Sequence, residues 1–358
     1  SNTATTVLML PIATSVAALV TERIGGADGS DHGASRDAER FGIALLLGVA
    51  YAASIGGIGT LIGTPPNVFL AAHLKNDYGI EIGFARWMGA ALPFVIVFLA
   101  LAWLVLAHGL FRVSFREVPG GRRLIQGELA KLGPPSRGEK SVLAVFLFTA
   151  MLWVFREPLE SWDAFTRVLS GFPRLGDPGI ALVGAFLLFL IPVDVRKRRF
   201  LLDWETAARL PWGVLLLFGG GLSLAAAVDE SGLAAWVSRR FPSDLPIFGL
   251  MALVTVAVVF FTELTSNIAT TTVFVPILGS IAVASGSDPR LLVIPAALSA
   301  SCAFMLPVAT PPNAIVFGSG LVPIRTMIAA GFWLNLIAIG LIVLSLRTLF
   351  GAVLGIEG

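Results

Sequence analysis

The chain has 358 residues, of which 56% are hydrophobic and 13% charged, and its formal net charge is +2. Soluble domains carry about 25% charged residues, so this composition excludes a soluble globular protein and indicates a polytopic membrane protein in a multi-pass arrangement. The small net charge, with arginines gathered in loops, gives no argument for nucleic-acid binding.

The first residues form a polar segment that returns in the second half of the chain. Ser-Asn-Thr-Ala-Thr-Thr at 1–6 recurs as Ser-Asn-Ile-Ala-Thr-Thr at 266–271, and seven of the twelve positions that start each copy are identical. Each copy is followed by Thr-Pro-Pro-Asn, at 64–67 and at 310–313. Polar, helix-breaking residues in apolar surroundings are costly, so two such sets point to the midplane binding site of a transporter.

Residues 3–20 are expected to be the returning arm of a helical hairpin whose tip is Ser1-Asn2. The sequence starts inside this motif and without a Met, so we expect further N-terminal spans that this sequence does not contain.

Two uncharged runs, 41–74 and 291–324, are each 34 residues long. That is too long for one span and too short for two spans with a polar loop. Both contain the Thr-Pro-Pro-Asn segment, where the first proline disfavours helix before it and a new helix can start with proline in its first turn. We therefore predict two broken transmembrane helices, interrupted near 59–67 and 305–313.

Other uncharged runs predict continuous helices. The run at 87–111 has 25 residues, enough at roughly 1.5 Å per residue to cross about 30 Å of hydrocarbon. Further helices are expected at 141–155, 178–193, 211–228 and 326–346.

The apolar arms 245–262 and 268–287 flank a second polar tip, which contains Ser266-Asn267. This pattern predicts a re-entrant hairpin over 245–287 that enters and leaves on one side. Glu263 is the only acidic residue inside it, and we expect its carboxylate to fix the tip rather than to carry a coupled proton.

The basic loops set the predicted orientation, because cytoplasmic loops carry an excess of Lys and Arg. Loops 112–140 and 194–210 hold seven and five basic residues and are placed in the cytoplasm. Because successive spans cross the membrane in alternate directions, the loops at 75–86, 156–177 and 229–244 are then placed outside, together with the C-terminus. The second hairpin opens to the opposite side of the membrane from the first, so the two repeats are inverted. Residues 1–111 are the C-terminal part of the first repeat, 112–140 are a cytoplasmic linker, and 141–358 are the second repeat.

Helix starts beside the polar tips can bind oxyanions through backbone N–H groups and the helix dipole, without a basic side chain. No Lys or Arg occurs in the four signature segments. Carbonyl, hydroxyl and amide oxygens at unwound stretches suit a hard cation such as sodium. One architecture can thus hold an anion and its coupling cation side by side.

These four segments, in this order, resemble the divalent anion sodium symporter family over the whole chain. The resemblance implies an ion-transporter fold of elevator type, a homodimer in a bacterial inner membrane, and sodium-coupled uptake of a C4-dicarboxylate such as succinate, malate or fumarate. It implies no cofactor beyond the coupling Na⁺. By the same resemblance the substrate contacts would be Ser1, Asn2, Thr3, Thr64, Pro65, Ser266, Asn267, Thr310 and Pro311, and the sodium ligands Asn2, Gly63, Thr262, Asn267 and Ala309.

One position departs from the family pattern. Ile268 stands where the first copy has Thr3, which removes a hydroxyl from the substrate side and leaves room for another divalent anion. A sodium-independent dicarboxylate exchanger and a symporter of sodium with sulfate or another oxyanion therefore stay open, with an ion channel as a remote alternative. The chain has no hydrolase motif and only scattered histidines, so we expect neither an enzyme nor a metal site other than sodium.

Overall fold

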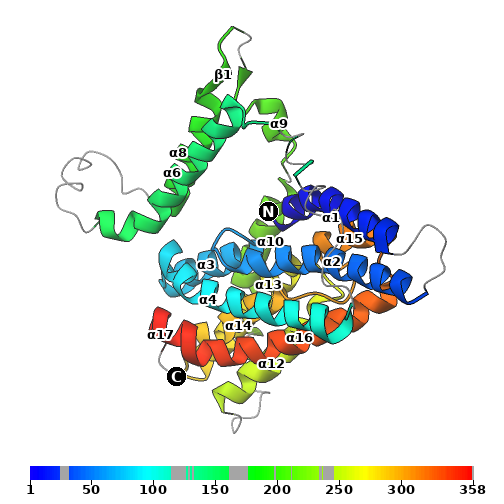
Figure 1. The fold of residues 1–358 in the computed structure, drawn as a ribbon. Coiled ribbons are helices and arrows are strands. Elements are labelled where there is room, and N and C mark those ends of the chain that lie inside the picture. The colour runs from blue at the N-terminus through cyan, green and yellow to red at the C-terminus, as the bar shows by residue number, and fades with distance from the viewer. Residues whose placement is uncertain are drawn as a thin grey trace. The chain divides into compact units, whose positions relative to one another are not determined.

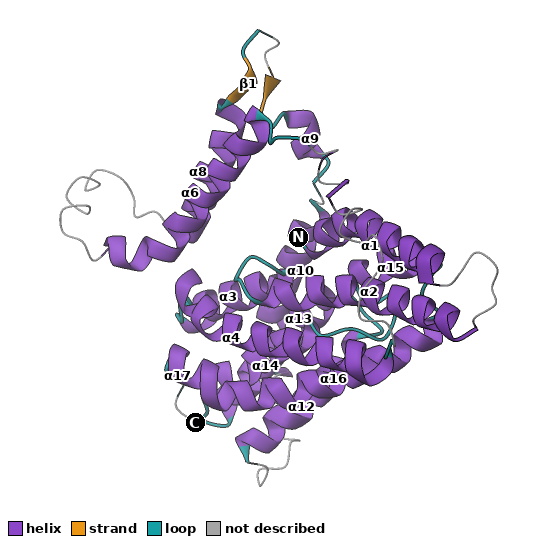
Figure 2. Ribbon diagram, viewed as in Figure 1, coloured by secondary structure: helices purple, strands orange, loops and turns teal. Residues whose placement is uncertain are grey.

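The structure is a computed structural model that describes residues 1–24, 32–113, 126–127, 130, 133–160, 176–196, 199–210, 212–233, 236 and 246–356. The described chain is almost entirely helical, and its two strands form a single antiparallel pair (Figure 2). Six helical stretches are long and apolar enough to cross a membrane: Asn2–Ile24, Gly33–Ile58, Phe84–Leu110, Arg137–Arg156, Asn267–Ala284 and Ile324–Leu354. The predicted all-α polytopic membrane class is confirmed.

The chain divides into two compact units. The first comprises Ser1–Ile82, Arg86–Gly121 and Leu215–Gly358, and the second comprises Gly83–Ala85 and Arg122–Val214.

The first unit contains both polar signatures and both helix breaks (Figure 1). It is built from α1 (Asn2–Ile24), α2 (His32–Ile58), α3 (Pro65–Tyr78), most of α4 (Phe84–Trp103), the π-helix η1 (Leu104–Leu110), most of α10 (Gly213–Glu230), α12 (Ile247–Thr262), α13 (Asn267–Ala284), α14 (Arg290–Ala300), α15 (Pro311–Gly318), α16 (Ile324–Ser345), the π-helix η2 (Leu346–Phe350) and α17 (Gly351–Leu354).

Each Ser-Asn helix packs against both repeats. Helix α1 lies along α2 and also contacts α15, the helix that restarts after the second break. Helix α13 correspondingly contacts α14 and α3, the helix that restarts after the first break. The two polar signatures are therefore each held by one element of their own repeat and one element of the other.

An aromatic cluster anchors the second break in the core. Phe304 packs edge-on against Tyr51 of α2 and Phe98 of α4, with ring centroids 5.4 and 5.7 Å apart. Phe94 continues the contact from Phe98 to Phe350 of η2. Buried aromatic pairs of this kind favour edge-to-face geometry and contribute beyond their buried area, so the unwound chain at Phe304 has a fixed position.

The first break agrees with the prediction and the second differs from it. Helix α2 ends at Ile58 and α3 begins at Pro65, so 59–64 are unwound, within the predicted interval. Helix α14 already ends at Ala300, and the unwound stretch runs over 301–310 instead of starting near 305. The reason is that side chains, described below, take the hydrogen bonds of this longer stretch.

The second unit contains α6 (Arg137–Glu160), α8 (Asp177–Leu190), β1 (Pro192–Asp194), β2 (Arg199–Phe200) and α9 (Trp204–Ala208). Helices α6 and α8 lie side by side (Figure 1). The stretch 194–210, predicted as a plain loop, instead contains β2 and α9. Asp194 Oδ1 accepts the Arg196 N–H at 3.0 Å and turns the chain, and Asp203 caps α9 by accepting the Thr206 N–H at 2.8 Å.

Candidate functional site

Within the first unit, each polar tip lies against the helix break of its own repeat. The tip of the second hairpin consists of Glu263 to Ser266, between α12 and α13. Ser266 is the N-cap of α13, and its hydroxyl accepts the Ala269 N–H at 3.1 Å. A serine at this position satisfies one of the free N–H groups at the start of a helix, which explains why α13 begins at Asn267.

Three oxygens lie together beside this tip. The Thr262 hydroxyl donates to the Ala300 carbonyl at 3.0 Å and lies 3.2 Å from Asn267 Oδ1. A hydroxyl, an amide oxygen and the last carbonyl of α14 are the neutral oxygen ligands that a hard cation prefers. Two of the predicted sodium ligands, Thr262 and Asn267, are thus brought together, and the Ala300 carbonyl joins them without having been predicted.

Ala309, the third ligand predicted here, is buried in the unwound stretch, where its N–H donates to the Leu306 carbonyl at 3.2 Å. No contact joins it to Thr262 or Asn267 among the described interactions.

The first tip has a corresponding cluster. A methyl group added at Gly57 would lie 2.4 Å from Asn2 Oδ1, so the Asn2 amide lies directly against the Gly57 backbone. A methyl group at Gly63 would lie 2.3 Å from the Gly57 carbonyl oxygen and 2.7 Å from the Thr60 hydroxyl. Gly57 therefore lies against both members of the predicted pair, Asn2 and Gly63, and its carbonyl oxygen faces Gly63.

Each break is held by the asparagine of its Thr-Pro-Pro-Asn segment. Asn67 Nδ2 donates to the carbonyls of Ile58 and Thr60 at 3.1 and 2.9 Å. Asn313 Nδ2 donates to those of Ala303 and Leu306, both at 3.1 Å. The two asparagines are fully buried and replace hydrogen bonds that the interrupted helices lack. Sequence reasoning missed this role, although the repetition of Asn after the tandem prolines was a signal for it.

Glu263 ties the second hairpin tip to the second break. Its carboxylate is 3% exposed and accepts the backbone N–H groups of Phe304, Met305 and Leu306 at 2.8, 2.9 and 3.0 Å. Asn335 Nδ2 of α16 donates to it at 2.8 Å. The three backbone donors account for the early end of α14, because the carboxylate takes the N–H groups that a continuing helix would use.

The remaining predicted substrate contacts differ in accessibility. Ser1, Thr3, Ser266 and Pro311 are exposed, whereas Pro65 and Ile268 are half-buried. Thr64 and Thr310 are each only 3% exposed. Thr310 is the N-cap of α15, and its hydroxyl accepts the Asn313 N–H at 3.3 Å.

Free backbone N–H groups were expected at the restarted helices, but most lie at the hairpin helices. Pro311 and Pro312 contribute no N–H, and the N–H of Asn313 is used by Thr310, so the restarted helix α15 offers few donors. The hairpin helices offer more, because Asn267 and Ile268 precede the first helical hydrogen bond of α13, which Thr270 donates to Ser266. An anion would therefore find its backbone donors at the Ser-Asn tips.

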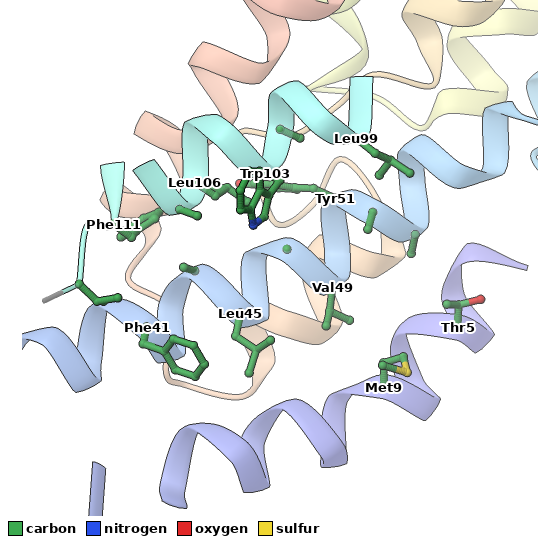
Figure 3. A pocket seen from close by; sticks show the side chains of 17 residues that line it. Thr5, Met9, Phe41, Leu45, Val49, Tyr51, Leu99, Trp103, Leu106 and Phe111 are labelled. Carbon is green, nitrogen blue, oxygen red and sulfur yellow. The ribbon is translucent and has the colours of Figure 1, made fainter. Parts of the chain in front are cut away.

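The cavity drawn in Figure 3 is not this site. It measures about 750 Å³ and is lined by apolar side chains of α1, α2, α4 and η1, among them Met9, Leu45 and Trp103. Its one phenol, on Tyr51, donates to the Met327 carbonyl at 3.3 Å. Its one aliphatic hydroxyl, on Thr5, donates to the Ser1 carbonyl at 3.2 Å. A lining with so few polar groups is a poor fit for a divalent anion.

Comparison with known proteins identifies the family. A model described as the sodium:sulfate symporter transmembrane region matches residues 1–356. This chain belongs to that family.

Relatives within the sodium:sulfate symporter family are similar over the whole chain. One, named sodium-dependent dicarboxylate transporter SdcS, from Staphylococcus saprophyticus, is 43% identical over 362 residues, which cover 100% of this chain and 67% of the relative. A protein of the same name from Staphylococcus aureus strain USA300 is 42% identical over 361 residues with the same coverage. The expected family is confirmed, and it is a family of transporters rather than enzymes.

Proposed function

We propose that this chain is a secondary transporter that couples sodium to the movement of a divalent organic anion, a C4-dicarboxylate such as succinate, malate or fumarate. The observation that carries the proposal is the cluster of neutral oxygens from Thr262, Asn267 and Ala300 next to the open start of α13. Such an arrangement suits a cation at the Asn267 side chain and an anion at the backbone N–H groups beside it. The names of the two staphylococcal relatives agree with this substrate class.

Energetics favour coupling. Moving a dianion into a cell with a negative interior costs about 2.3 kcal/mol per charge per 100 mV, or roughly 4.6 kcal/mol for both charges. Two co-transported monovalent cations would cancel this cost, and a third would make the voltage a driving force. Uptake without sodium would need exchange for another anion, which is the alternative that a test must separate.

The proposal extends to the way the protein works as a whole. The two tips would bind the solute at mid-membrane and carry it in an elevator movement within a homodimer, in a cell membrane with the C-terminus outside. Ser1, Asn2, Ser266 and Asn267 would contact the substrate carboxylates. Asn2 with Gly63, and Thr262 with Asn267 and Ala309, would hold the sodium ions.

Succinate uptake by proteoliposomes, titrated with sodium at a constant membrane potential, tests the proposal. We expect the uptake rate to saturate with the succinate concentration and to rise with the sodium concentration more steeply than linearly. Uptake that is independent of sodium but accelerated by succinate inside the vesicles would instead identify the exchanger. Current at channel rates would rule out a carrier.

Sulfate transport is the second candidate, because Ile268 removes a hydroxyl that the first copy has at Thr3. Replacing Ile268 with Thr should tighten succinate binding several-fold relative to sulfate, since the side chain is half-buried at the tip and a hydroxyl there adds a hydrogen-bond donor. Competition of unlabelled sulfate and succinate for labelled succinate measures this ratio. An unchanged ratio would remove Ile268 from substrate selection.

A further inference from the structure

The second unit contains a groove that the transport function does not use. Two cavities, of about 680 and 520 Å³, share Val193 of β1 and lie against the first turns of α6. The larger one is lined by the basic side chains Arg137, Lys140 and Arg196. The smaller one is lined by apolar side chains of α6, with Arg199. We call the two together the α6–β1 groove.

The charge of the groove is positive. Arg137, Lys140 and Arg196 are exposed, and none of them forms an ion pair within the described chain. Asp194 is the one carboxylate in the lining of the larger cavity, and its Oδ1 accepts the Arg196 N–H. Three cations against one carboxylate leave a net attraction for an anion.

The smaller cavity is nearly balanced in charge. Its two charged groups are Arg199 and Glu139, and the Glu139 carboxylate accepts the Ser136 N–H at 2.6 Å, where it closes the cap of α6.

The groove lies where membrane spans begin and end. Helix α6 is a candidate span from Arg137, and α8 ends at Leu190, directly before β1. Trp204 and Trp212, which follow β2, are 71% and 50% exposed, as is typical of the aromatic residues that sit at headgroup level. The basic cavity is thus at the level of lipid headgroups.

The apolar cavity follows α6 into the span. Val142, Leu143 and Phe146 lie one to three turns into α6 and are 43%, 55% and 61% exposed. Because they are exposed next to a basic cavity, the groove has one polar end and one apolar wall. A free phosphate ion would make no use of the apolar wall.

We propose that the α6–β1 groove binds an anionic phospholipid. Its phosphate lies between Arg137, Lys140 and Arg196, and the upper part of one acyl chain lies on Leu143 and Phe146. Basic pockets beside span ends attract anionic headgroups in this way, each Lys or Arg strengthening the attraction about fivefold.

Native mass spectrometry of the full chain with added phosphatidylglycerol tests the proposal. In the triple variant Arg137→Gln, Lys140→Gln, Arg196→Gln, retained phosphatidylglycerol should fall at least tenfold. The matched control removes three positive charges elsewhere, in Arg40→Gln, Lys75→Gln, Arg209→Gln, each of which pairs with a neighbouring carboxylate. Equal retention in wild type and triple variant, or an equal loss in the control, would overturn the proposal.

Further arms separate the lipid from other sources of the signal. Rising salt should release phosphatidylglycerol from the wild-type chain, a measurement that needs no variant. Phe146→Gln, which leaves every charge in place, should lower retention, and no change would refute the acyl contact. Displacement of phosphatidylglycerol by water-soluble glycerol phosphate, at the same concentration as the lipid, would identify a free phosphate site. Equal retention of phosphatidylcholine would exclude recognition by charge. Either result would overturn the proposal.

Discussion

Asn267 is the residue on which the proposed cation and anion sites converge. Its amide oxygen lies beside the Thr262 hydroxyl, and its backbone N–H is among the open donors of α13. A residue that bound both ligands would couple sodium to the anion without any basic side chain in the signature segments.

Replacing Asn267 with Ala should weaken sodium binding and succinate binding together, each by at least tenfold, because a cation loses one ligand and the anion loses the cation. Calorimetric titration of the purified protein measures both affinities. Ser285→Ala is the control, since the Ser285 hydroxyl donates to the Ile281 carbonyl at 2.9 Å, at the end of α13 that lies away from the tip. Unchanged sodium affinity in Asn267→Ala would refute the shared site.

Gly57 offers a second test at the first tip. The added methyl group in Gly57→Ala would displace the Asn2 side chain, because the two would otherwise be 2.4 Å apart. We expect a folded protein whose sodium affinity falls several-fold. The neighbouring variant Gly56→Ala meets no atom within 4 Å and should bind sodium like wild type. Equal sodium affinity in both variants would show that Asn2 does not contribute to the site.

Many of the residues at the two tips and breaks could be predicted from the sequence, because the Ser-Asn and Thr-Pro-Pro-Asn segments occur twice. The roles of Gly57 and of Asn67 and Asn313 could not. A glycine in an apolar run is usually explained by helix packing, and only the three-dimensional path of the break shows that Gly57 lies against both Asn2 and Gly63.

At the scale of the elements, the hairpin and the second break form one construction. The Glu263 carboxylate at the end of α12 accepts three consecutive N–H groups of the unwound stretch and one amide N–H from α16. Glu263 thus fixes the hairpin tip, as the sequence suggested. It does so by holding residues more than forty positions away, which no local pattern reveals.

Glu263→Gln should lower the free energy of unfolding by about 3 kcal/mol, because hydrogen bonds to a charged acceptor are lost and the new amide N–H groups face N–H donors. A thermal unfolding curve in detergent measures the loss. Glu205→Gln, at an exposed ion pair with Arg209, should change stability by less than about 1 kcal/mol. Equal melting temperatures for the two variants would contradict the role of Glu263.

The ends of the elements were harder to predict than their existence. The tandem prolines correctly gave the starts of α3 and α15 at Pro65 and Pro311. The end of α14 at Ala300 depends on Glu263, and the pairing of β1 with β2 depends on Asp194 turning the chain. Both are tertiary or side-chain effects that override the apolar pattern.

At the scale of the whole molecule, the two halves of the chain are interleaved. Helix α1 contacts α15, and α13 contacts α3, so the signatures of one repeat are supported by the broken helix of the other. Composition and uncharged runs suffice to predict a polytopic helical protein. The two compact units are a different division of the chain from the predicted repeats: α6 and α8 belong to the second unit, and the elements that carry the breaks belong to the first.

If sodium and a divalent anion bind at adjoining sites made by the same tips, their affinities must be linked. The most direct measurement is the dissociation constant of succinate for the purified protein, determined in saturating sodium and in potassium of equal concentration. We predict that succinate binds at least fivefold more tightly in sodium, and that sodium binds more tightly by the same factor when succinate is present. A succinate affinity that is the same in both salts would contradict it.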